Sequence, residues 1–243
     1  VVDTFSREET ALVKGHAVLW VMLSHLFATP KIYADYDLNL TFFSDEVLNF
    51  ITFQLGAVAV PIFAFLTGYG LYRKYQRRQT KENERSVLSA SYIYKDWTRF
   101  AKGILFFTLP IVLYHLIIKK QADFYYFDFS FFRGFIDTVL DALGLSSLFK
   151  CPTINGSWWY LSIATFFIVF NTVIFYIGDH INFLVIILLC TFATRDLLPE
   201  GQVPNYQRVW YFLPAFCLGA IFAKHNLFNR IKSSTSRFAI LNK

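Results

Sequence analysis

The stretch LVKGHAVLWVMLSHLF, residues 12–27, is an apolar run that contains three ionisable side chains, Lys14, His16 and His25. A run of about 20 predominantly apolar residues is long enough to cross the hydrocarbon core of a membrane as a helix. A charged group at the centre of a bilayer costs at least about 2.5 kcal/mol, so such groups usually mark a functional site. The stretch therefore predicts a membrane-spanning helix that carries functional side chains.

Lys14 and His25 share one face of this predicted helix. They are eleven positions apart, which at about 100° per residue leaves them about 20° apart around the axis and about 16 Å apart along it. His16 is nine residues from His25 and points to nearly the opposite face. An imidazole can accept and return a proton near neutral pH, which favours a functional role for His25. Because Lys14 and His25 share one face, we expect them to act together. His16 is expected to be an interfacial or packing residue.

The composition of the 243-residue chain is that of a polytopic membrane protein. Hydrophobic residues make up 55% of the chain and charged residues 16%, whereas a soluble domain carries about 25% charge. The formal net charge is +6, but Lys and Arg gather at the ends of apolar runs, and no basic patch is interleaved with aromatic residues. Nucleic acid is therefore not an expected partner.

The spacing of the three cysteines matches no metal motif, so no metal is expected.

Six apolar segments are predicted to cross the membrane, so the expected fold is all-α, a bundle of six transmembrane helices in one domain over residues 1–243. These segments are residues 11–28, 47–72, 103–118, 158–177, 181–194 and 209–223. A further segment, 132–149, is ambiguous and fits a re-entrant stretch, an interfacial helix or a short polar span. It carries Asp137 and Asp141, four residues apart and therefore on one helical face.

The basic segment RKYQRRQTKENER, residues 73–85, sets the predicted orientation. Because cytoplasmic loops are enriched in Lys and Arg, we place this segment in the cytoplasm. Alternation of the spans then places the N-terminus and residues 73–102, 178–180 and 224–237 on the same side. This alternation requires that residues 132–149 either do not cross the membrane or cross it twice.

Several of these segments together resemble the acyltransferase-3 family of integral membrane acyltransferases. Members typically show a basic residue, ten intervening residues and a histidine in the first span, as Lys14 and His25 do here. The sequence PIFAFLTGYG, residues 61–70, is similar to a second-span signature of the family, with Thr67 where Ser is usual. The weaker matches are the basic stretch with Lys95, Arg99 and Lys102, WWYLS at 158–162, and WYFLPAFCLGAIFAK at 210–224.

The chain also departs from the family pattern. The family usually has Arg at the position of Lys14, and its proline after the basic stretch usually comes sooner than Pro110 does here. The family fold has about ten spans and the sequence contains six. We therefore expect a truncated form of the ten-span fold that is incomplete at its C-terminus.

The resemblance implies transfer of an acyl group, commonly acetyl, from cytoplasmic acyl-CoA to a hydroxyl group of an extracytoplasmic or lipid-linked glycan. Such an enzyme would lie among the lipids of a bacterial inner membrane, with its N-terminus in the cytoplasm. His25 is then the expected general base, and the expected donor-binding cations are Lys14, Lys95, Arg99 and Lys102. The expected acceptor-binding or cavity-lining residues are Thr67, Tyr69, Trp158, Trp159 and Tyr160, and Asp137 and Asp141 are candidates for orienting the imidazole.

Two other classes of protein remain open from the residues alone. A transporter or flippase-like subunit would also contain intramembrane charge and helices interrupted by Pro or Gly. Inverted repeats would favour that class, and the sequence shows none. A structural subunit would use the same charged residues only to pair with the helices of a partner. Release of a thiol from acyl-CoA separates the enzyme from both alternatives.

Overall fold

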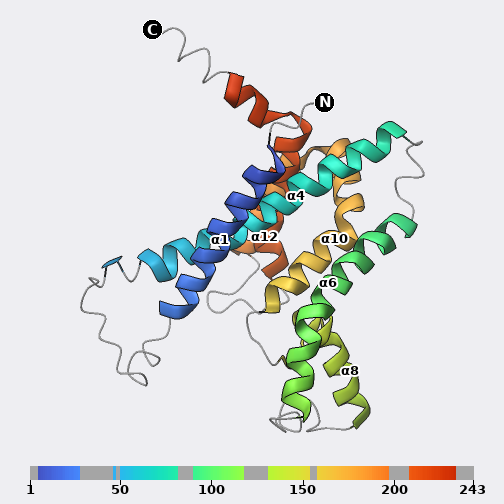
Figure 1. The fold of residues 1–243 in the computed structure, drawn as a ribbon. Helices are drawn as coiled ribbons and strands as arrows, with labels where there is room; N and C mark the ends of the chain where they lie inside the picture. Colours follow the sequence, from blue (N-terminus) through green and yellow to red (C-terminus); the bar gives the residue numbers. More distant parts are fainter. Residues whose placement is uncertain are drawn as a thin grey trace.

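The computed structural model describes residues 5–27, 46–47, 50–81, 90–117, 131–153, 158–196 and 208–233. These residues are helical with no strand, which confirms the predicted all-α class (Figure 1). The elements are α1 (Arg7–Phe27), the π-helical η1 (Phe50–Leu55), α4 (Gly56–Lys81), α6 (Ala90–Ile117), α8 (Phe131–Ala142), α9 (Ser146–Phe149), α10 (Trp159–Ile177), the π-helical η3 (Gly178–Asn182), α11 (Phe183–Asp196) and α12 (Arg208–Lys224).

Helix α1 begins with a capping box. The Ser6 hydroxyl accepts a hydrogen bond from the Glu9 backbone N–H at 3.0 Å, and the Glu9 carboxylate accepts one from the Ser6 backbone N–H at 2.7 Å. These reciprocal bonds satisfy two backbone donors that the first helical turn would otherwise leave unpaired. The helix therefore starts before the apolar run and carries Lys14, His16 and His25 on one continuous element.

Helices α4 and α12 cross at the centre of the molecule with their backbones in close contact (Figure 1). A Cβ atom at Gly68 of α4 would overlap the carbonyl oxygen of Phe216, and one at Gly219 of α12 would overlap the carbonyl oxygen of Phe65. Phe167 of α10 stacks on Phe216 with a ring-centroid distance of 4.4 Å. The core is therefore built around two glycines, one on each helix, with aromatic rings packed beside them.

Four segments that were predicted to share one side of the membrane lie at one end of the molecule. Asp179 of η3 accepts a hydrogen bond from the Tyr72 hydroxyl at 2.7 Å and forms an ion pair with Lys224 at 2.8 Å. Lys232, in the helical stretch after α12, donates to Glu9 at 2.7 Å. These contacts join the start of α1, the second half of α4, η3 and the segment after α12 (upper part of Figure 1).

Helix α8 has its apolar side chains outside and its acids inside. Phe132 is 75% exposed and Phe135 is 57% exposed, whereas Asp137 is 3% exposed and Asp141 is fully buried. Water as solvent would favour the opposite arrangement, but lipid favours apolar side chains outside and ionisable groups facing the protein interior. The ambiguous segment 132–149 is therefore a short helix followed by the brief α9, with a lipid-compatible outer face.

Within the described ranges, one helix, Trp159–Thr194, is long and apolar enough to cross a membrane by length and composition. It includes η3, where the chain continues through a π-helical turn with a φ of 102° at Asn182, between the predicted spans 158–177 and 181–194. The predicted bundle of six transmembrane helices is not confirmed. At about 1.5 Å per residue, the 12-residue α8 is about 18 Å long and the 17-residue α12 about 26 Å, less than the hydrocarbon thickness of about 30 Å.

Candidate functional site

Helices α1, α4, α6 and α10 surround a cavity of about 620 Å³. Five of the site residues predicted from the sequence line it, namely His25, Arg99, Trp158, Trp159 and Tyr160. The other lining residues are Val21, Val60, Phe63, Phe100, Gly103, Ile104, Phe107, Thr108, Ile111 and Leu161. The structure thus brings together, from three separate helices, side chains that come from three different sequence motifs.

His25 enters the cavity from the last turn of α1. Val21, one turn earlier on the same face, lines the cavity with it. A Cβ atom at Gly56 of α4 would overlap the Ser24 hydroxyl, so Gly56 lets the end of α1 lie directly against α4. The His25 ring makes no hydrogen bond to any residue that the structure describes. Both ring nitrogens are therefore available, within the described part of the chain, to a ligand in the cavity.

A stripe of cations runs along the first half of α6. Lys95, Arg99 and Lys102 are spaced by four and three residues, so they share one helical face, and all three side chains are exposed. None of the three forms an ion pair with a described residue. Arg99 alone of this stripe lines the cavity, and Ile111, twelve residues further along α6, lies about 18 Å from it along the helix axis. The cavity therefore has a cationic end on α6 and a long apolar wall.

Lys14 lies on the helical face that also carries Val21 and His25, but outside the cavity lining. Seven residues separate it from Val21, which places it about 10 Å further along α1. His16 faces elsewhere: it is exposed, and its Nδ1 lies 2.9 Å from the Leu12 carbonyl oxygen. The donor-binding role of Lys14 stays a prediction.

The aromatic motif at the start of α10 forms one wall of the cavity. Trp158 is buried and packs with Val112 of α6 and Ala142 of α8. The Tyr160 ring lies 5.8 Å from that of Phe63, and its phenol interacts with the Thr67 side chain.

Thr67 and Tyr69 have different surroundings. Thr67 donates a hydrogen bond to the Phe63 carbonyl at 2.7 Å and lies directly behind the lining. Tyr69 packs against Phe5 and Phe228, with ring centroids 5.8 and 5.5 Å away, and is outside the lining.

The two acids of α8 are buried but do not line the cavity. Asp137 accepts a hydrogen bond from Arg133 at 3.2 Å and contacts the Cys151 thiol. Asp141 is fully buried. The Thr108 hydroxyl, which lines the cavity, donates to the Ala142 carbonyl and so braces α8 against α6. The orienting role of the two acids stays a prediction.

The described residues contain no group of three His, Cys, Asp or Glu side chains that could hold a metal ion.

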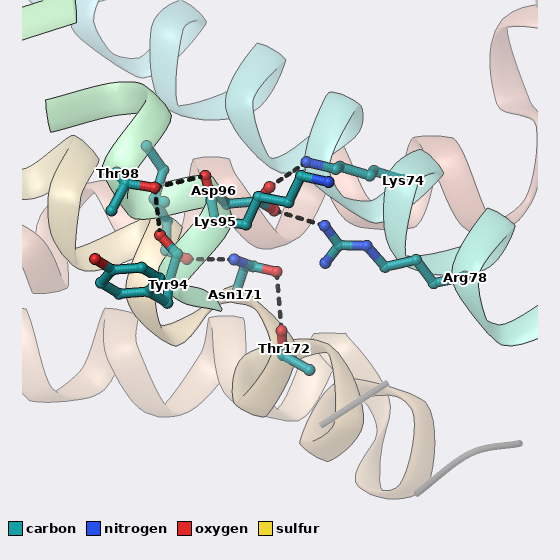
Figure 2. A network of polar contacts seen from close by, with 9 residues as sticks. Lys74, Arg78, Tyr94, Lys95, Asp96, Thr98, Asn171 and Thr172 are labelled. Carbon is teal, nitrogen blue, oxygen red and sulfur yellow. Dashed lines mark hydrogen bonds and ion pairs between the residues drawn. The ribbon is translucent and has the colours of Figure 1, made fainter. Parts of the chain in front are cut away.

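Sequence reasoning missed a buried carboxylate that joins α4 to α6. Asp96 receives a hydrogen bond from Arg78 at 2.9 Å and one from Lys74, and Figure 2 shows both cations reaching its carboxylate. Two features could have signalled it: Lys74 and Arg78 are four residues apart, and Asp96 is an isolated acid among the cations of α6. Asp96 precedes Arg99 by one turn, so the ion pairs join α4 to α6 one turn away from the cation that lines the cavity.

Arg208, the first residue of α12, is a second residue that the sequence did not single out. It lines a neighbouring cavity of about 430 Å³, which shares Val60 and Trp159 with the first cavity. Its guanidinium carbon lies 4.6 Å from the centroid of the Trp159 ring. The only sequence signal was a basic residue at the start of the last apolar run.

The sequence profile of a protein family described as an acyltransferase domain matches residues 11–241 of the chain. The match extends from the second turn of α1 to beyond the end of α12, so it includes every residue of both cavities. Comparisons with curated proteins and with solved structures found no match.

Proposed function

Because the chain belongs to the acyltransferase-3 family, we propose that this membrane acyltransferase moves an acyl group from acyl-CoA to a hydroxyl group of a glycan, with His25 as the general base. The observation that carries the proposal is that His25 of α1 and Arg99 of α6 line the same cavity. A base and a cation at one predominantly apolar cavity are what a transfer from an anionic thioester requires.

We propose that Arg99 binds the phosphates of the donor, with Lys95 and Lys102 on the same helical face. A guanidinium grips a phosphate through two parallel hydrogen bonds, whereas a lysine acts as a point charge. Lys14 adds a further cation on the face of α1 that carries His25. The apolar wall between Arg99 and the aromatic residues of α10 then accommodates the pantetheine arm, and the thioester reaches His25. The proposed acyl group is acetyl.

In the proposed reaction, His25 removes the proton from the acceptor hydroxyl as the hydroxyl oxygen attacks the thioester carbonyl carbon. A new C–O bond forms and the carbonyl oxygen takes the negative charge of a tetrahedral intermediate. When the intermediate collapses, the C–S bond breaks and the imidazolium returns its proton to the leaving thiolate. Proton transfer by a positioned side chain typically contributes about 10²–10⁴-fold to the rate. The exposed His25 ring, with no described partner, is free to make both transfers.

We place the cationic end of α6 on the cytoplasmic side, with the N-terminus, in a bacterial inner membrane. Supporting this, the basic end of α4, η3 and the segment after α12 lie together at one end of the molecule. The acceptor glycan, extracytoplasmic or lipid-linked, then approaches from the end that carries Trp158, Trp159 and His25. The family assignment favours transferase chemistry over a transporter or flippase-like subunit.

The test is the release of free thiol from acetyl-CoA by purified protein in lipid nanodiscs, with and without a glycan acceptor. We expect His25→Ala to lower the rate by about 10²–10⁴-fold. The matched control is His16→Ala, which removes an exposed histidine on the opposite face of the same helix and should leave the rate unchanged. Unimpaired turnover by folded His25→Ala protein would remove His25 from the mechanism.

A further inference from the structure

Arg208 is a half-buried cation without an acidic partner among the described residues. Its guanidinium lies over the face of Trp159, 4.6 Å from the ring centroid. A cation–π contact of this kind contributes about 0.5–2 kcal/mol, but it does not neutralise the charge. A partly desolvated charge in a membrane protein is normally paired or serves a ligand. The Arg208 guanidinium is therefore suited to bind a negatively charged ligand.

Three aromatic side chains and a single cation, Arg208, line the cavity, together with small and aliphatic residues of α4. Trp159 stacks on Phe212 with centroids 5.6 Å apart and planes at 27°. Tyr211 adds a third ring and a hydroxyl group to the lining. Arg208 is also the first residue of α12, so the positive end of the helix dipole adds to its potential. Flat aromatic faces beside a guanidinium suit a ligand with an apolar ring face and an anionic substituent.

This second cavity meets the His25 cavity along a shared wall. Val60 and Trp159 line both cavities. Gly56 lines the second cavity, and the space where its side chain would be is occupied by Ser24, the residue before His25. Only the shared wall of Val60 and Trp159 therefore separates a ligand on the Arg208 side from the His25 cavity.

We propose that the Arg208 cavity binds the acceptor as a negatively charged saccharide. Its phosphate or carboxylate pairs with the Arg208 guanidinium, and its ring lies on the aromatic surface of Trp159 and Phe212. This inference rests on the proposed function, since it identifies the cavity that presents the acceptor hydroxyl to the reaction at His25. It commits to the charge of the acceptor, which the family assignment leaves open.

Binding is tested directly in nanodiscs of zwitterionic phosphatidylcholine. Titrations use glucose 1-phosphate, methyl glucuronide and the neutral methyl glucoside, with tryptophan fluorescence as the readout. Trp159→Phe identifies the responding residue among the five tryptophans. The variants are Arg208→Gln, Arg208→Lys and, as the control, Lys150→Gln, which removes the same charge from an exposed lysine outside both cavities.

The protein should bind the two anionic sugars about tenfold or more tightly than the neutral glucoside, because a charge-assisted hydrogen bond adds at least that factor. Arg208→Gln should abolish the difference, Arg208→Lys should retain part of it, and Lys150→Gln should retain all of it. Equal binding of neutral and anionic sugars, or the same loss in Lys150→Gln as in Arg208→Gln, overturns the proposal.

Two further measurements separate the possible failures. If inorganic phosphate binds as tightly as glucose 1-phosphate, or phosphatidylglycerol in the nanodisc removes the response, then Arg208 holds a lipid headgroup or a free phosphate and the saccharide assignment is wrong. If the anionic sugars bind through Arg208 but receive no acyl group from acetyl-CoA, the saccharide site stands and the proposed transfer reaction fails.

Discussion

The Arg78 guanidinium donates a hydrogen bond to the Asp96 carboxylate at 2.9 Å, and this contact joins α4 to α6. Lys74, one turn before Arg78, donates to the other carboxylate oxygen. The Asp96 side chain is 7% exposed and those of Arg78 and Lys74 are 14% and 40% exposed. A single buried acid thus pairs with two cations from the basic segment that set the predicted orientation (Figure 2).

Removing that acid should destabilise the protein. Asp96→Ala leaves the mostly buried Arg78 and the partly exposed Lys74 without their shared partner. Breaking a buried ion pair lowers the free energy of unfolding by about 3–5 kcal/mol. Because Lys74 is partly exposed, we expect a smaller loss here, about 2 kcal/mol. For a chain of this length that loss lowers the Tm by about 4–8 °C. Thermal unfolding in detergent measures it, and the exposed Glu8→Ala is the control. Equal Tm values for the two variants would show that the ion pairs contribute nothing.

The sequence predicted the helices better than their contacts. The predicted spans 158–177 and 209–223 match α10 and α12 to within one residue at each end, because both are continuous apolar runs. Residues 73–81 were assigned to the basic cytoplasmic segment that follows the span 47–72, and the structure shows that they continue α4. Arg, Lys and Gln are good helix formers, and Lys74 and Arg78 have a partner on α6 that the local sequence does not reveal.

The sequence indicates candidate residues on single helices, but it does not indicate which of these helices line one cavity. Helical periodicity placed Lys14 and His25 on one face, and the structure shows Val21 and His25 of that face lining the cavity. Periodicity cannot tell which other helix covers a given face. The juxtaposition of His25 with Arg99, 74 residues later, and the second cavity at Arg208 depend on how helices pack, which a single sequence does not encode locally.

Gly68 and Gly70, two residues apart in the second-span signature, should respond differently to the same substitution. A Cβ atom at Gly68 would overlap the Phe216 backbone, so Gly68→Ala must push α4 and α12 apart. Nothing lies within 4 Å of a Cβ atom at Gly70, so Gly70→Ala should be neutral or stabilising by up to about 1 kcal/mol from helix propensity. Folded yield and Tm in detergent measure both effects. If Gly68→Ala folds like Gly70→Ala, the close crossing of α4 and α12 is wrong.

Arg99→Gln should weaken donor binding more than Lys102→Gln does. Both substitutions remove one positive charge from the same face of α6, but only Arg99 lines the cavity. We expect the KM for acetyl-CoA to rise about tenfold or more in Arg99→Gln, because a charge-assisted contact to a phosphate is lost, and to rise only a few-fold in Lys102→Gln. Added salt should raise the KM of the unmodified protein and have less effect on Arg99→Gln. Equal KM values for the two variants would place the donor phosphates elsewhere.

Cys151 should react slowly with maleimides, at a rate that depends on Asp137. The Cys151 thiol donates to the Phe149 carbonyl at 3.6 Å, and burial, followed by the interaction with the Asp137 carboxylate, raises its pKa to about 11. Because the thiolate is the reactive form, labelling at pH 8 should be slow and should rise about tenfold per pH unit up to pH 10. Asp137→Asn removes the second cause, so its Cys151 should have a lower pKa and react several-fold faster at pH 8.

The raised pKa of Cys151 also makes the stability of the folded protein depend on pH. The thiol ionises near pH 9 in the unfolded chain and near 11 in the folded one, so the unfolded state loses its proton first and folding becomes less favourable as the pH rises through this window. Cys151→Ser should remove both the labelling and this part of the pH dependence. Cys190 and Cys217, which are buried in helices, should stay unlabelled in the folded protein. Rapid labelling of Cys151 at pH 7, or an Asp137→Asn variant that reacts no faster, would contradict the contact between the thiol and Asp137.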